Sequence, residues 1–152
     1  MDVLFYHLAE SRLDQALPLL VARCRERDWS VFVQTGDAEQ IPSIDEALWT
    51  YRDDSFLAHG AAGRSDFEAE RHPVWIDSGD AATSRDVHFA VNRATPEGPA
   101  PLERLLYIFD GHDAVALAQA RERWTAEKEA GHKLTYWQQD GGRWVEKATA
   151  NG

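Results

Sequence analysis

The chain has 152 residues, of which 43% are hydrophobic and 28% charged, and its formal net charge is −10. This length and composition are typical of a globular protein that buries its own core, and we expect a single domain over residues 1–152. The acidic excess argues against a protein whose main activity is binding the DNA phosphate backbone through clustered lysine and arginine.

The first half of the chain predicts two strand–helix pairs. Residues 3–8 form an apolar run typical of a strand buried on both faces. A capping box at Ser11 is expected to open a helix that extends to Cys24 and beyond, with Pro18 causing a kink or a later start. Residues 29–35 predict the second strand and residues 38–50 the second helix.

The second half predicts further strands separated by loops, at residues 74–77, 87–92, 106–109 and 133–138. The run 102–109 is also compatible with a short helix that leads into the third of these strands. We expect Asp113 to cap the longest helix, 114–130, and Gly131 to end it. A Gly-Gly turn at 141–142 then precedes a short strand or tail. This alternation predicts a three-layer α/β/α sandwich, Rossmann-like, around a mostly parallel sheet.

The termini and the cysteine content indicate where the protein works. The N-terminal residues show no basic leader and no small-residue cleavage site, and no apolar run approaches the roughly 20 residues of a membrane span. We therefore expect a cytoplasmic protein. Cys24 is the single cysteine, and its position in a helical pattern predicts a buried structural thiol rather than a nucleophile.

The loop after the first predicted strand argues against nucleotide binding. It runs from His7 to Ser11 without a glycine, whereas loops that hold phosphates need glycines so that backbone amides approach the ligand. Glu10 would also repel phosphates. No two histidines have the spacing of a metal pair on a helix. We therefore expect no nucleotide, metal or other cofactor.

One acidic cluster leaves two interpretations open. Asp110, His112 and Asp113 follow a predicted strand within the segment FDGHD. They are typical of a turn followed by a helix cap, which is the interpretation that we favour. The alternative is a metal or acid–base site, which would make the protein a small metal-dependent α/β enzyme.

The longest predicted helix carries a more specific pattern. Four of its residues are spaced by four, three and four positions and share one face: Leu117, Arg121, Trp124 and Lys128. In one interpretation the two cations bind the carboxylates of a short acidic peptide, while the indole packs against its apolar end. In the other, Leu117 and Trp124 belong to the core and the cations extend along its rim.

Several segments, taken together and in order, resemble the chi subunit of bacterial DNA polymerase III. They are VLFYHL at the N-terminus, IDEALWTY followed by SFLAHG, then HPVWI, IFDGHD, RERW and AGHKLTYWQQ. The resemblance extends from residue 3 to about residue 146. It implies a Rossmann-like α/β fold and a non-catalytic accessory subunit of the clamp-loader complex.

The resemblance also implies two protein partners. The first is the acidic, phenylalanine-terminated tail of single-stranded DNA-binding protein, which the family binds at positions matching Arg121 and Trp124. Leu117 stands where some members have a lysine, so Lys128 or Arg123 is expected to compensate, and Phe109 is expected to line the pocket. The second partner is the psi subunit, whose surface matches Trp49 and Phe56.

Contact with DNA is expected to be indirect, through these partners. The sequence contains six tryptophans, a residue type enriched at interfaces. They leave open a direct contact with single-stranded DNA, which the net charge disfavours.

Overall fold

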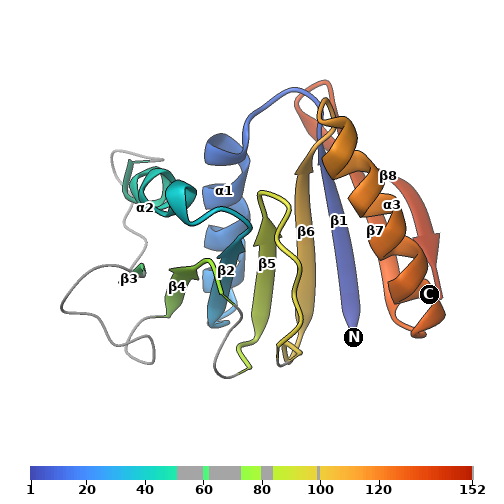
Figure 1. The fold of residues 1–152 in the computed structure, drawn as a ribbon, viewed down its shortest axis with the longest axis horizontal. Helices are drawn as coiled ribbons and strands as arrows, with labels where there is room; N and C mark the ends of the chain where they lie inside the picture. The colour runs from blue at the N-terminus through green and yellow to red at the C-terminus, as the bar shows by residue number, and fades with distance from the viewer. Residues whose placement is uncertain (51–59, 62–72, 80–83, 99, 152) are drawn as a thin grey trace.

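The computed structural model describes residues 1–50, 60–61, 73–79, 84–98 and 100–151, and all of its strands join one sheet (Figure 1). The strands are β1 (Asp2–Leu8), β2 (Val31–Thr35), β3 (Gly60–Ala61), β4 (Val74–Asp77), β5 (Val87–Val91), β6 (Arg104–Asp110), β7 (Lys133–Asp140) and β8 (Arg143–Ala150). Their order across the sheet is β3-β4-β2-β5-β6-β1-β7-β8. Only the β7–β8 pair is antiparallel in the described sheet.

Helices cover both faces of the sheet, which confirms the predicted three-layer sandwich (Figure 1). One face carries α1 (Leu13–Glu26), a short 3-10 turn at Ala38–Gln40, and α2 (Ile41–Thr50). The opposite face carries α3 (Ala114–Glu129). Successive side chains of β1 alternate between the two layers. Phe5 packs with Ala116 and Ala120 of α3, whereas Leu8 belongs to the layer on the α1 side.

The crossovers diverge at the centre of the sheet, between β1 and β6. These strands are parallel neighbours, with Leu8 beside Asp110 at their carboxyl ends. From β1 the chain passes through α1 to β2, and from β6 it passes through α3, on the other face, to β7. In open α/β sheets such a divergence creates a crevice beyond the strand ends.

The predicted capping box at Ser11 is wrong, and so is the later helix start, one of the two alternatives expected at Pro18. The helix begins at Leu13 with Arg12 at the N-cap. The amide of Arg12 donates to Oε1 of Gln15 at 3.0 Å, and the Ser11 hydroxyl accepts instead from Nε2 of Gln139. The helix also does not start late, because it continues through Pro18, which is buried.

The alternative of a short helix within residues 102–109 is also wrong. β6 begins at Arg104 and pairs along its length with β1, from Asp2–Arg104 to Leu8–Asp110. A central parallel strand is buried on both faces and therefore needs a continuous apolar run. At the other end of the sheet, the predicted short strand or tail after Gly142 is a full strand, β8.

Cys24 is buried in the core layer on the α1 side, which confirms the predicted structural thiol. Burial raises the pKa of the Cys24 thiol to about 11, and the nearby guanidinium groups of Arg104 and Arg27 act in the opposite direction. Because the thiolate is the nucleophile, this environment keeps the sulfur unreactive near neutral pH.

Candidate protein-binding site

Helix α3 is held close to the sheet at its N-terminal half. The Asp113 carboxylate accepts hydrogen bonds from the amides of Val115, at 3.0 Å, and Ala116, at 3.3 Å, which confirms the predicted cap. Ala116 and Ala120 are the buried residues of the helix. Since neither extends beyond Cβ, the helix lies close to the strands and its larger side chains are placed along its flanks.

The flank toward β7 carries the four residues that the sequence pattern singled out. Leu117 and Trp124 are half-buried against the core layer on the α3 side. The Trp124 ring lies 5.4 Å from Phe5 and 6.0 Å from Tyr136, measured between ring centroids. Arg121 and Lys128 are exposed. The apolar pair therefore contributes to the core, and also keeps part of its surface open beside two cations.

Phe109, which is expected to line the pocket, is almost fully buried. Its side chain is only 8% exposed, and its ring contacts those of His7, at 5.3 Å, and Tyr136, at 6.0 Å. Phe109 therefore packs beneath the rings of His7 and Tyr136, on the side toward the core, and contributes little exposed surface.

Tyr136 belongs to this flank and is hydrogen-bonded to His7 beside it, and the sequence interpretation missed both residues. The His7 Nδ1 and the Tyr136 hydroxyl are hydrogen-bonded at 2.6 Å. Burial raises the pKa of the Tyr136 phenol, and the positive charge of Arg121 opposes that rise. We use the name α3 flank for Leu117, Arg121, Trp124, Lys128 and Tyr136.

The pKa of His7 is lowered below its usual value. Partial withdrawal of the ring from water is the largest cause, and the proximity of His112 acts in the same direction, while Asp110 opposes both. A neutral His7 has one donor and one acceptor nitrogen, and Tyr136 occupies one of them. The aromatic rings beneath and within the α3 flank are therefore uncharged. The positive charge of the flank comes from the exposed side chains of Arg121 and Lys128.

Trp49 and Phe56 cannot be compared with the prediction in the same way. Trp49 falls within α2, but its side chain and the whole of Phe56 lie outside the described residues. Their assignment to a psi-type partner stays a prediction.

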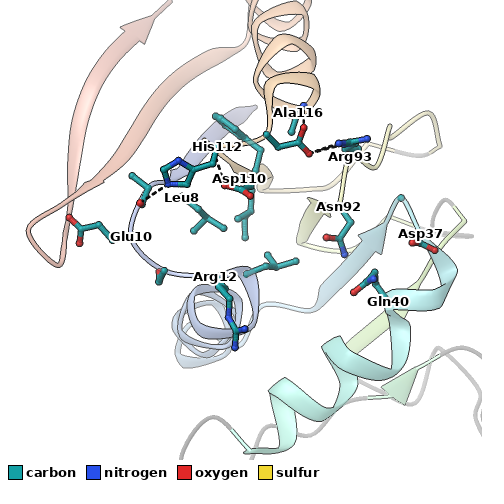
Figure 2. Close-up of a pocket in the computed structure, with 17 residues that line it drawn as sticks. Leu8, Glu10, Arg12, Asp37, Gln40, Asn92, Arg93, Asp110, His112 and Ala116 are labelled. Atoms are coloured by element: carbon teal, nitrogen blue, oxygen red, sulfur yellow. Dashed lines mark hydrogen bonds and ion pairs between the residues drawn. The ribbon is translucent and has the colours of Figure 1, made fainter.

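The carboxyl ends of β1, β2, β5 and β6 border an open cleft of about 810 Å³ (Figure 2). Two of its acidic residues have structural partners. Asp113 caps α3 and also accepts from Nε of Arg93 at 3.0 Å, an interaction that lowers the pKa of the Asp113 carboxyl. Asp110 accepts from the amide of His112 at 2.9 Å.

The His112 ring connects this turn to the β1–α1 loop, because its Nε2 lies 3.1 Å from the carbonyl oxygen of Ala9. The preferred interpretation of the FDGHD segment, a turn followed by a helix cap, is therefore confirmed. Within the described ranges, no group of three or more His, Cys, Asp or Glu side chains is arranged to hold a metal ion.

The loop between β1 and α1 is closed by the protein's own side chains. The amides of Ala9, Glu10 and Ser11 all donate to Oε1 of Gln139, each at 3.0 Å. Three successive amides directed at one oxygen resemble the backbone arrangement that binds phosphate in nucleotide-binding folds. Here the acceptor is a glutamine from β7, so this loop has no free amides to offer a ligand.

Glu10 makes the reciprocal connection. Its carboxylate accepts from the amides of Gly141, at 2.6 Å, and Gly142, at 2.9 Å, in the turn between β7 and β8. Both glycines have positive φ, 60° and 78°, which the two-residue hairpin turn requires. The side chains of Gln139 and Glu10 therefore connect the β1–α1 loop to the β7–β8 hairpin in both directions.

This fold defines a Rossmann-like α/β protein in which the amides of the first strand–helix loop are bound by a side chain of the protein itself. The α3 flank, with its aromatic rings and exposed cations, lies on the face of the sheet opposite α1. The chain belongs to the DNA polymerase III chi subunit (HolC) family, which its sequence matches over residues 1–135. It is therefore an accessory subunit in DNA replication and associates with other subunits of that polymerase.

No curated protein matches the chain. Among the residues that the structure describes, no helix is both long enough and apolar enough to span a membrane.

Proposed function

We propose that this chain links the clamp loader to single-stranded DNA-binding protein, without catalysis of its own, by binding the acidic C-terminal tail of that protein. One observation carries the proposal. Arg121 is exposed beside the half-buried rings of Trp124 and Tyr136 on an otherwise acidic protein.

The chemistry of the α3 flank fits such a tail. Arginine binds carboxylates through charge-assisted hydrogen bonds, and a partly open indole accepts an aromatic side chain. Arg121 has no ion-pair partner among the described residues, so its donors are available. Lys128 lies two helical turns further along the same flank and supplies a second positive charge.

The deciding experiment is calorimetric titration with a tail peptide, beside the same peptide without its terminal phenylalanine. We expect micromolar binding that is lost with the phenylalanine. Arg121→Glu should weaken binding by about 1.5–3 kcal/mol, the usual size of a charge-assisted hydrogen bond. Arg27→Glu is the matched control, because Arg27 follows α1 on the opposite face of the sheet. Equal binding by wild type and Arg121→Glu would remove the α3 flank as the site.

The second part of the proposal is pairing with a psi-type subunit through Trp49 and Phe56. The family resemblance supports it, together with the placement of Trp49 near the end of α2. Copurification of the psi subunit with wild type and with a Trp49→Ala, Phe56→Ala double variant tests it directly. Retention of psi by the folded double variant would contradict it. The proposed setting of both interactions is the cytoplasm.

A further inference from the structure

A second aromatic surface lies on the face of the sheet opposite α3. On that face the helices pack along β2, β3, β4 and β6, and no described helix packs along β7 or β8. Trp137 of β7 is half-buried there beside Tyr6, its neighbour in the β1–β7 register. Trp144 of β8 packs on the same Tyr6, with ring centroids 5.0 Å apart.

A third tryptophan, Trp29, packs against the same core layer, and its ring lies beside two arginines. The guanidinium carbons of Arg27 and Arg104 lie 4.9 Å and 5.0 Å from the ring centroid of Trp29. Burial raises the pKa of the Tyr6 phenol, and the positive charges of Arg104 and of Arg23, in the last turn of α1, oppose the rise. We call this surface the tryptophan–arginine patch, which consists of Trp29, Trp137, Trp144, Arg23, Arg27 and Arg104.

The arginines of the patch, Arg23, Arg27 and Arg104, are not ion-paired with a carboxylate in the part of the chain that the structure describes. Acidic residues lie nearby: Asp2 beside Arg104 in the β1–β6 register, Glu146 opposite Trp137, and Asp86, whose carboxylate accepts from the amide of Ser30 next to Trp29. The patch therefore gathers unpaired positive charge on a protein whose net charge is −10.

We propose that the tryptophan–arginine patch binds single-stranded DNA. Aromatic rings on an uncovered part of a sheet face, with arginines on the same side of the sheet, are the arrangement on which sheet-based nucleic-acid-binding domains stack unpaired bases and hold the phosphates. Trp137 and Trp144 lie beyond residues 1–135, the span that matches the family. The patch is thus built jointly by the family core and by the segment that follows it.

Charge sets the expected strength of binding. The net charge of the whole chain repels DNA, so the affinity should be low and measurable only at low salt. Three phosphate contacts on a single strand predict a slope of about −2 for log K against log salt, at roughly −0.7 per contact. Because every base can stack on an aromatic ring, we expect little preference between base sequences.

The test is fluorescence anisotropy of a labelled oligothymidine, titrated with the full chain at several salt concentrations. We expect the Arg23→Ala, Arg27→Ala double variant, in which both side chains are exposed, to flatten the slope by about 1.4. Trp144→Ala should weaken binding roughly tenfold or more. Arg121→Glu, on the other face, should bind as wild type does, whether or not the tail-binding proposal holds.

Three results would overturn the proposal. One is no binding by the wild type at low salt. Another is an equal loss in Arg121→Glu and in the double variant, which would place the contact elsewhere or make it nonspecific. The third is displacement of the oligonucleotide by an acidic tail peptide whose own binding needs Arg23 and Arg27, which would assign the patch to a protein partner.

Discussion

Gln139 and Ser11 hold each other through two hydrogen bonds of opposite sense. The Ser11 amide donates to Oε1 of Gln139 at 3.0 Å, and Nε2 of Gln139 donates to the Ser11 hydroxyl. The same Oε1 also accepts from Ala9 and Glu10. One side chain from β7 therefore fixes the loop through which the chain passes from β1 to α1.

Removing that side chain should cost stability without changing the core. We expect Gln139→Ala to lower the free energy of unfolding by about 1–3 kcal/mol, toward the lower end because water reaches these amides. Urea unfolding followed by tryptophan fluorescence measures the loss. Gln138→Ala, the half-buried neighbour on the same strand, is the control and should stay within about 0.5 kcal/mol of wild type. Equal effects from the two variants would show that the three-amide contact has no special role.

Gly111 is required by the close approach of His7. A Cβ at position 111 would overlap the His7 imidazole, whereas one at Gly79 would meet nothing within 4 Å. Gly111→Ala should therefore destabilise the fold by about 1–3 kcal/mol, and Gly79→Ala should be nearly neutral. Combining Gly111→Ala with His7→Ala should recover part of the loss, because the obstructing ring is gone. Without that recovery, the glycine would be needed for a backbone reason instead.

The lowered pKa of His7 makes stability depend on pH. In the folded state the ring resists protonation, so below the unfolded value of about 6.5 the unfolded chain binds the proton first. Stability should accordingly fall as pH drops through that value toward the folded pKa. Urea midpoints between about pH 7.5 and about pH 5.5 should decline less in His7→Gln than in wild type. An NMR titration placing the His7 pKa above its usual value would reverse the expectation.

Leu117 offers a gain-of-function test of the α3 flank. It is half-buried one turn before Arg121, so Leu117→Lys would extend the cationic flank at a cost of about 1 kcal/mol in stability. We expect tail-peptide affinity to rise by about 0.5–1 kcal/mol and to become more sensitive to salt. Calorimetry at two ionic strengths measures both effects, with Leu117→Gln as the uncharged control. A rise in affinity in both variants would attribute the effect to shape and not to charge.

Local patterns were sufficient to predict much of the fold from the sequence. The run Val74–Asp77 forms a strand with the expected bounds, and Asp113 caps α3 as its position before an apolar segment indicated. The helix considered before β6 does not form, because pairing with β1 decides the conformation of that run. Similarly, Ser11 loses the cap position because a glutamine from β7 occupies its hydroxyl.

The site was predictable along α3 and not across strands. Spacing by three and four residues placed Arg121 and Trp124 together, since a helix makes neighbours of such positions. His7 and Tyr136 are 129 residues apart, and no local pattern joins them. Alternation in β1 and β7 predicts which face each residue occupies, but not that the two strands are adjacent.

The position of β1 has a consequence for biosynthesis. Its two neighbours in the sheet, β6 and β7, follow it only after more than half of the chain. While the ribosome is still making the middle of the protein, β1 has emerged with both of its edges unpaired and its apolar side chains exposed. Topologies dominated by such distant pairings fold slowly and are open to aggregation meanwhile. β1 is therefore synthesised well before either of the strands that enclose it.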